Sequence, residues 1–160
     1  MRLSGMNFFI LTGDKKETAV TIGRSCGLID SKMKIINIPD YSPDKDREWR
    51  MNMLILKEDK EEKVFLLNAE KAIPPEIPLH PTICYRCTPK NKEEIVRRVK
   101  EQTNHLTMAV GDGSNDVNMI KEASVGVGIK GKEGTEAARV ADYVAGEFKF
   151  IKLLTLYYGR

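Results

Sequence analysis

The chain has no long apolar run and no large excess of charge of either sign. Its 160 residues contain no stretch near the ~18–20 apolar residues that a membrane-spanning helix needs. The first residues also lack the apolar core of a secretory signal. The net charge is only +3, with basic and acidic residues interleaved, which argues against nucleic acid as a partner. We therefore expect a soluble, intracellular globular domain.

Cysteine is scarce, with three residues and no even set that could form a disulfide framework. Cys84 and Cys87 form a C-x-x-C pair, which could be half of a zinc site or a redox pair. A zinc site needs about four ligands, but there is no second pair, and His80 and His105 are isolated. We predict that the two cysteines are small structural residues without a metal.

Apolar runs of strand length alternate with helical patterns along most of the chain. Strands are predicted at 8–11, 34–38, 64–67, 82–86, 106–110, 125–129 and near 143, and helices at 15–26, 44–56, 88–102, 116–123, 133–141 and from 148. Gly27 stands where the first helix would end in a left-handed residue. Strands that alternate with helices predict an α/β fold with a parallel sheet.

Two of the predicted strands end in clusters of glycine and aspartate. Thr12-Gly13-Asp14 follows the first strand, and Gly111-Asp112-Gly113-Ser114-Asn115-Asp116 follows the strand at 106–110. Ligands of open parallel sheets bind at the carboxyl ends of the strands. Glycines allow the backbone to approach a phosphate closely and direct N–H groups at it. A phosphate site is therefore predicted at these strand ends.

Oxygen and nitrogen side chains in these clusters suggest individual roles. Asp112, at a strand tip, is the predicted direct ligand of Mg²⁺, and Asp116, which opens a helix, a second or water-mediated ligand. Thr12 offers a hydroxyl and Asn115 an amide to phosphate oxygens. Lys92 lies near a helix N-terminus, where its charge would neutralise a phosphoryl group.

Each motif alone has an ordinary explanation. Thr12-Gly13-Asp14 could be a simple turn, and Lys92 could be a surface lysine. The turn at 111–116 could be part of a calcium loop, but it has no glutamate at the twelfth position and no preceding helix. Their occurrence together, on strand ends and in this order, favours the phosphate site.

These motifs resemble those of P-type ATPase phosphorylation domains. Leu11 to Ala19 is similar to the family's L-T-G-D-x-x-E-T-A, Pro89 to Lys92 to its P-x-x-K, and Gly111 to Asp116 to its G-D-G-x-N-D. The resemblance implies a Rossmann-like, haloacid-dehalogenase-type fold, a mostly parallel sheet with helices on both faces. It covers residues 1–36 and 82–160, so 1–160 would be a partial phosphorylation domain in which 37–81 is a variable insert.

Further stretches resemble the phospholipid-transporting (flippase) subfamily more than the ion pumps. They are Cys84 to Pro89, Val125 to Ile129 with Gly131 to Gly134, and Ala141 to Tyr143 with Phe148-Lys149. The implied full-length enzyme is an ATP-driven translocase at the cytoplasmic face of a membrane. Its expected cofactors are Mg²⁺ and ATP, and its expected partners are a phospholipid, bound by membrane helices, and an accessory subunit.

The resemblance also implies roles residue by residue. The nucleotide or phosphoryl group would contact Thr12, Gly13, Asp14, Arg86, Lys92, Asn115 and Asp116; Mg²⁺ would be held by Asp112 and Asp116; and Lys92, Thr12 and Asp112 would be catalytic. The family's nucleophile is the aspartate of D-K-T-G-T, and this sequence has no such stretch. The resemblance thus implies a fragment without the nucleophile strand, which would lie between the strands at 7–11 and 106–110, and without activity on its own.

Two alternatives remain open. The chain could be a fragment of a cation-transporting P-type ATPase, since the residues that would select the substrate are not among the motifs. It could also be a catalytically inactive haloacid-dehalogenase-like binding module. A free-standing phosphatase of that superfamily needs Asp-x-Asp near its start, and Asp14 is followed by two lysines.

Overall fold

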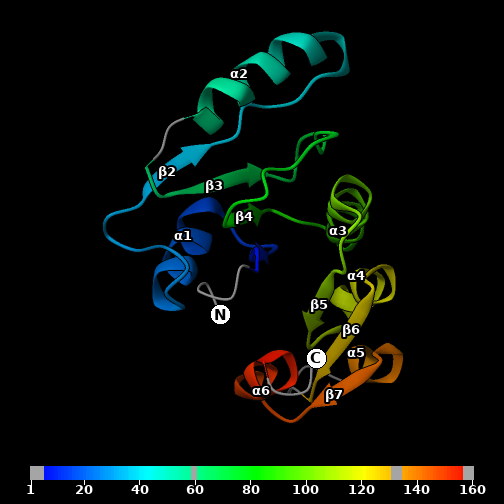
Figure 1. Ribbon diagram of the computed structural model, residues 1–160. Coiled ribbons are helices and arrows are strands. Elements are labelled where there is room, and N and C mark those ends of the chain that lie inside the picture. Colours follow the sequence, from blue (N-terminus) through cyan, green and yellow to red (C-terminus); the bar gives the residue numbers. More distant parts are fainter. Residues whose placement is uncertain (1–5, 59–60, 131–134, 157–160) are drawn as a thin grey trace. The chain divides into compact units, whose positions relative to one another are not determined.

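The computed structural model describes residues 6–58, 61–130 and 135–156. The chain divides into two compact units, Arg2–Thr88 and Pro89–Arg160, which are described separately here (Figure 1). In the described ranges no helix combines the length and the apolar character needed to cross a membrane.

The first unit is built on a parallel sheet of four strands. Its strands are β1 (Phe9–Leu11), β2 (Lys34–Asn37), β3 (Lys63–Asn68) and β4 (Thr82–Tyr85), in the order β1-β4-β3-β2. Leu11 is in register with Cys84, and Asn68 with Tyr85, so the carboxyl ends of β1, β4 and β3 lie together. The polar residues that follow these strands therefore gather at one edge of the sheet.

Helix α1 (Lys16–Ser25) packs on one face of this sheet. Ala19 is fully buried there, in a core that also contains Val64 and Ile83. Gly23 allows the close approach, because a Cβ at that position would lie 2.5 Å from the Ile83 Cδ1 atom. The helix is followed by Gly27 at φ +73°, the left-handed residue that the sequence predicted.

Helix α2 (Asp46–Glu58) follows a short 3-10 turn, η2 (Pro43–Lys45). It is bound to the first sheet on the face opposite to α1. Side chains alternate along a strand, so Lys63 points away from the face that carries Val64. Its ammonium donates to the Leu56 carbonyl oxygen at 2.9 Å, near the end of α2. The Trp49 indole N–H donates to the Pro39 carbonyl at 2.9 Å. The first sheet thus has a helix on each face.

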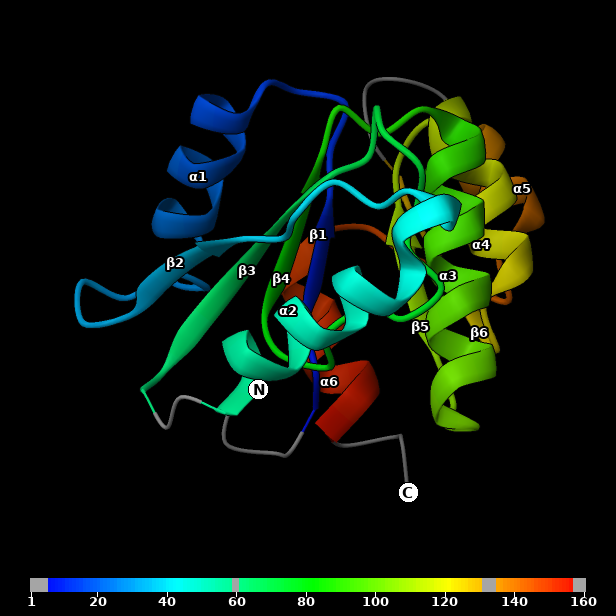
Figure 2. The same cartoon turned by 90° about the horizontal axis from the view of Figure 1, so that it is seen from above.

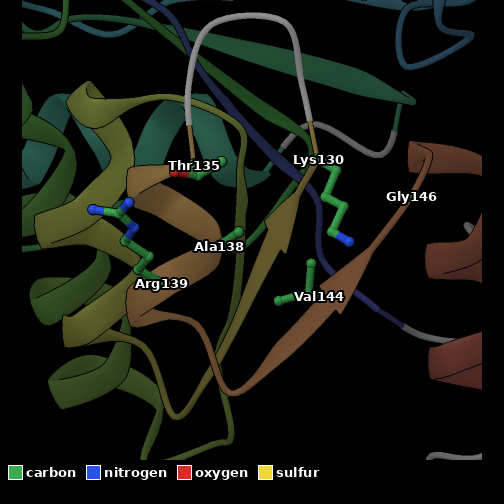
Figure 3. Close-up of a pocket in the computed structure, with 6 residues that line it drawn as sticks. All are labelled: Lys130, Thr135, Ala138, Arg139, Val144 and Gly146. Atoms are coloured by element: carbon green, nitrogen blue, oxygen red, sulfur yellow. The ribbon is translucent and has the colours of Figure 1, made fainter.

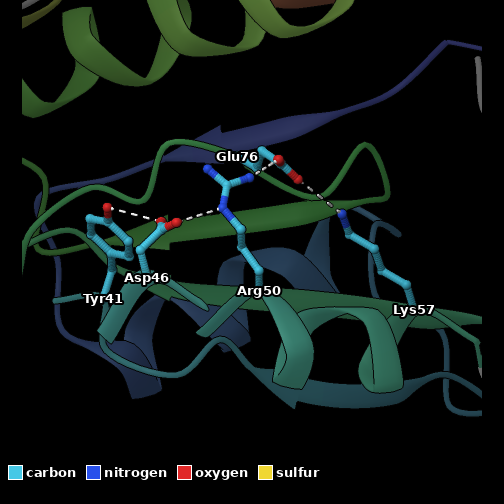
Figure 4. Close-up of polar contacts among 5 residues, drawn as sticks. All are labelled: Tyr41, Asp46, Arg50, Lys57 and Glu76. Atoms are coloured by element: carbon cyan, nitrogen blue, oxygen red, sulfur yellow. Dashed lines mark hydrogen bonds and ion pairs between the residues drawn. The ribbon is translucent and has the colours of Figure 1, made fainter. Parts of the chain in front are cut away.

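A chain of polar contacts ties α2 to the connection between β3 and β4 (Figure 4). The Tyr41 hydroxyl donates to Asp46 at 3.2 Å, and Arg50 pairs with Asp46 at 2.7 Å. Arg50 also pairs with Glu76, whose other carboxylate oxygen lies 3.9 Å from the Lys57 ammonium. These contacts are exposed, so they orient α2 and add little stability.

The second unit contains a parallel sheet of three strands in the order β5-β6-β7. Its elements are α3 (Pro89–Thr103), β5 (Met108–Gly111), η3 (Ser114–Asp116), α4 (Val117–Glu122), β6 (Val125–Ile129), α5 (Glu136–Val140), β7 (Tyr143–Ala145), η4 (Phe148–Phe150) and α6 (Ile151–Leu156). Helix α4 packs on β5 and β6, α5 packs on β6, and α3 packs against α4 (Figure 2).

Glycines in β6 set how closely these helices approach the sheet. A Cβ at Gly126 would lie 2.6 Å from the Ile120 Cγ2 atom and 2.9 Å from the Ile120 carbonyl oxygen. A Cβ at Gly128 would lie 2.6 Å from the Cα atom of Ala138, in α5. Gly126 and Gly128, the two glycines of the stretch from Val125 to Ile129, thus have a steric reason in this fold, because α4 and α5 occupy the space that side chains would need.

The predicted parallel α/β class is confirmed, and the strands are divided between two sheets. β1 and β5, which the resemblance places on either side of a nucleophile strand, are end strands of different sheets. The segment predicted to be a variable insert, 37–81, supplies β3, which lies between β2 and β4. Strand β5 begins at Met108, and Leu106 is 88% exposed. The predicted start of a helix at 133 and the Gly131 to Gly134 motif lie outside the described residues.

We expect Gly128→Ala to destabilise the second unit by about 1–3 kcal/mol, because the new methyl group would meet the backbone of α5. Native-state hydrogen exchange of the β6 amides measures this change locally. The matched control is Gly146→Ala, since nothing lies within 4 Å of a Cβ there. The control should be neutral or slightly stabilising, by up to about 1 kcal/mol. Equal protection of β6 in the two variants would contradict the close packing of α5.

Candidate functional site

In the first unit, the turn after β1 is bound to the loop after β4 by backbone hydrogen bonds. The Thr12 N–H donates to the Cys84 carbonyl at 3.0 Å, and the Cys87 N–H donates to the Thr12 carbonyl at 2.9 Å. The Arg86 N–H donates to the Asp14 carbonyl at 2.9 Å. The structure therefore brings together Thr12, Asp14 and Arg86, which the sequence analysis assigned to one site.

The Thr12 side chain is oriented by its own turn. Its hydroxyl donates to the Asp14 carboxylate at 2.9 Å and accepts the Asp14 N–H at 3.2 Å, a local pattern typical of threonine in turns. Both side chains are accessible to solvent. At Gly13 an added Cβ would make only an ordinary contact, 3.5 Å from the Cys87 carbonyl oxygen. The surrounding chain therefore does not require glycine at this position.

Arg86 has two features that the sequence did not indicate. Its backbone is left-handed, with φ 56°, a conformation that is uncommon for a residue with a side chain. Its guanidinium forms an ion pair with Glu70, which follows β3. The hydrogen bond to Glu70 is the main reason that the pKa of Arg86 is raised. Glu70 was missed because nothing in the local sequence links positions 70 and 86.

In the second unit, Lys92 and Asp116 form a largely buried ion pair. The Lys92 ammonium, from the first turns of α3, lies 2.7 Å from the Asp116 Oδ1 atom, and each side chain is 12% exposed. The Asp116 Oδ2 atom accepts the N–H of Asp112 at 3.3 Å. The structure thus brings together the predicted residues Lys92, Asp112 and Asp116 at the carboxyl end of β5.

Gly111 is required by the position of Asp116. A Cβ on Gly111 would lie 2.3 Å from the Asp116 Cβ atom and 2.7 Å from its Oδ2 atom. The aspartate side chain therefore folds back over the end of β5, where it reaches both the Asp112 N–H and Lys92. Gly111 was predicted to allow the backbone to approach a phosphate, whereas the close contact in the fold is with Asp116.

The carboxylates of this unit differ in their ability to bind a metal. Asp116 uses both oxygens within the protein, on Lys92 and on the backbone of Asp112. The Asp112 carboxylate is exposed, and across the described ranges no hydrogen bond or ion pair involves its side chain. Asn115 is also exposed beside it. Mg²⁺ commonly takes one or two carboxylates and completes its shell with water and phosphate, so Asp112 fits a direct ligand and Asp116 a supporting one.

The part of the chain that the structure describes has no group of three or more His, Cys, Asp and Glu side chains that could hold a metal. Cys84 and Cys87 are both buried, and the Cys87 thiol donates to the Cys84 carbonyl at 3.4 Å. Burial raises the pKa of the Cys84 thiol well above its ordinary value. Since the thiolate is the reactive form, the buried Cys84 behaves as a small packing residue.

A hollow of about 690 Å³ in the second unit does not coincide with the candidate site (Figure 3). It is lined by Lys130, Thr135, Ala138, Arg139, Val144 and Gly146, from the end of β6, helix α5 and β7. None of these residues was predicted to contact phosphate or metal. The candidate residues of this unit, Lys92, Asp112 and Asp116, are not among the residues that line the hollow.

Comparison with known proteins found no matching family model. The chain is 37% identical over 185 aligned positions to the phospholipid-transporting ATPase DRS2 of Saccharomyces cerevisiae, covering 98% of this chain and 13% of that protein. It is 36% identical to phospholipid-transporting ATPase 2 of Arabidopsis thaliana, covering 100% of this chain and 16% of that protein. For the phospholipid-transporting ATPase tat-1 of Caenorhabditis elegans the identity is 33%, over 94% of this chain and 15% of that protein.

The chain therefore spans about one seventh of the length of these relatives, 13–16%. The alignments extend over nearly all of this chain, so they span the segment 37–81. The alignment with the yeast protein occupies 185 positions, 25 more than the 160 residues of this chain (185 − 160). That relative thus has at least 25 residues that have no counterpart here.

We expect Asp116→Asn to lower the free energy of unfolding of the second unit by about 2–3 kcal/mol, because it leaves the largely buried Lys92 ammonium without a charged partner. Urea unfolding of Asp116→Asn, Lys92→Met and the double variant measures the coupling between the two residues. The double variant should be clearly more stable than the sum of the single effects predicts. Glu147→Gln, which breaks an exposed ion pair with Lys149, is the control and should change stability by less than about 0.5 kcal/mol. If the effects of Asp116→Asn and Lys92→Met on the free energy of unfolding simply add in the double variant, the two residues do not stabilise each other and the prediction is wrong.

Proposed function

Since this chain belongs, over the segment that it spans, to the phospholipid-transporting ATPases, we propose that it supplies the magnesium- and phosphate-contacting motifs of an ATP-driven phospholipid transporter. The observation that carries the proposal is the Lys92–Asp116 pair beside the exposed Asp112 carboxylate, at the carboxyl end of β5. The residues serve phosphorylation and dephosphorylation of an aspartate that this sequence does not contain, since it has no D-K-T-G-T.

Lys92 supplies positive charge at a fixed point. Asp116 occupies one of its N–H donors at 2.7 Å, and the ammonium has further donors for a phosphate oxygen. Because the pair is largely buried, Lys92 is held in place before the substrate arrives. A cation that needs no reorganisation stabilises the charge that develops during phosphoryl transfer more effectively than a mobile surface lysine does.

Asp112 and Asp116 divide the metal-binding role. Asp112 is the direct ligand, and Asp116 holds the backbone N–H of Asp112 and the Lys92 ammonium. When bound, Mg²⁺ neutralises phosphate oxygens and aligns them for an in-line transfer. Asn115, exposed between the two aspartates, offers an amide to a phosphate oxygen.

The first unit supplies the nucleotide or phosphoryl contacts at the end of its own sheet. The Thr12 hydroxyl and the Gly13 backbone face solvent beside Asp14, and Arg86 is bound to the same turn through its N–H. A guanidinium is suited to phosphate because it can donate two parallel hydrogen bonds. The full-length protein is proposed to use ATP and Mg²⁺ here, at the cytoplasmic face of a membrane, and to bind a phospholipid and an accessory subunit through other parts.

We expect this chain alone to form no acyl-phosphate and to hydrolyse no ATP, because covalent transfer needs a nucleophile that it lacks. Incubation with labelled ATP followed by an acid quench tests this, with a full-length phospholipid-transporting ATPase as the positive control. Label on the chain that survives acid and is released by hydroxylamine would show that another carboxylate accepts the phosphoryl group.

In a full-length protein that contains this segment, Asp112→Asn should reduce phosphoenzyme formation by at least about 10²-fold, since it removes a direct Mg²⁺ ligand from the transition state. The substitution should leave the fold unchanged, because the Asp112 side chain is exposed and within the described ranges its carboxylate forms no hydrogen bond or ion pair. Asp44→Asn, at an exposed carboxylate in η2 of the first unit, is the matched control and should remain active. Near-normal phosphorylation of the Asp112 variant would exclude the residue as the ligand.

A further inference from the structure

Glu70 and Arg86 leave the first sheet from neighbouring strands. Asn68 is in register with Tyr85, at the ends of β3 and β4. The Ala69 N–H donates to the Tyr85 carbonyl at 3.0 Å, so the pairing continues past the register pair. The Glu70 N–H then donates to the Asn68 side-chain oxygen at 3.2 Å, a turn that directs the chain away from the sheet.

The backbone of Arg86 is fixed by a hydrogen bond, whereas its side chain is exposed to solvent. Its φ of 56° and the hydrogen bond from its N–H to the Asp14 carbonyl fix the peptide beside the Thr12-Gly13-Asp14 turn. The Arg86 side chain is 47% exposed and that of Glu70 is 56% exposed. Solvent, and therefore a small anion, reaches both partners of the ion pair.

The charges around Arg86 are mainly acidic. Glu70 accepts a hydrogen bond from the guanidinium, and Glu17, in the first turn of α1, acts on it through space. When an anion approaches the turn after β1, the positive charge of Arg86 is thus already compensated by the Glu70 carboxylate.

We propose that Glu70 is a positioning residue that holds the Arg86 guanidinium until a phosphate group takes the place of the Glu70 carboxylate. The inference rests on the proposed role of Arg86 in binding phosphate and adds the residue that controls when its charge is available. A carboxylate and a phosphate compete for the same donors, and the doubly charged phosphate is the stronger acceptor. The pair with Glu70 is exposed, so it is weak enough to be exchanged.

The test is phosphate binding by the 160-residue chain at constant ionic strength, with inorganic phosphate as the probe. NMR signals of the amides of Thr12, Gly13, Asp14 and Arg86 report binding. Glu70→Gln keeps the shape of the side chain and removes its charge, so the dissociation constant should fall by about two- to five-fold, the scale of an exposed ion pair. Glu147→Gln, which removes the same charge from an exposed pair with Lys149, should change it by less than about 1.5-fold.

The Arg86→Ala background separates the inference from the proposed function. In that background phosphate binding should weaken, and Glu70→Gln should no longer improve it. If the original chain shows no saturable phosphate binding, or if Arg86→Ala binds phosphate as well as the original chain, the proposed role of Arg86 is wrong. If Arg86→Ala weakens binding but Glu70→Gln acts no differently from Glu147→Gln, Arg86 binds phosphate and the inference about Glu70 is wrong.

Discussion

The carboxylate of Asp116 organises the second unit around the end of β5. One oxygen holds the Lys92 ammonium from α3 and the other accepts the N–H of Asp112. This geometry requires the side chain to lie against Gly111, where a Cβ would be only 2.3 Å from that of Asp116. A strand end, a helix and the exposed Asp112 carboxylate are thus positioned by one side chain. Because the pair is largely buried, breaking it would leave a charge without compensation.

In the first unit, backbone hydrogen bonds position the candidate residues. Three of them join the turn after β1 to the loop after β4, and they involve Thr12, Cys84, Asp14, Arg86 and Cys87. The side chains of this turn remain exposed, and their orientation comes from local contacts such as that between Thr12 and Asp14. The candidate residues of the two units are therefore held by different interactions, a largely buried ion pair in the second unit and backbone hydrogen bonds between neighbouring chain segments in the first.

Much of the fold was predictable because its signals are local. Apolar runs predicted the strands β1 to β6, a short strand was expected near Tyr143, and Gly27 marked the end of α1. The site residues were predictable for the same reason, since glycine and aspartate follow β1 and β5 directly. Boundaries were less certain where propensity competed with packing. Leu106 is apolar enough for a strand, yet β5 begins only at Met108, where pairing with Val125 starts.

The order of apolar runs and turn residues was enough to predict the parallel α/β class and the strand ends that carry the motifs, and the sequence contains no D-K-T-G-T nucleophile motif. Tertiary structure alone decided which side chains meet: Lys92 with Asp116, 24 residues apart, and Arg86 with Glu70, 16 residues apart. It also decided the left-handed backbone of Arg86, at a position with no glycine or asparagine to indicate it. The physical reason is the distance along the sequence over which each kind of interaction acts. Periodicity and turn chemistry act over a few residues, whereas ion pairs form between residues that strand order and register bring together.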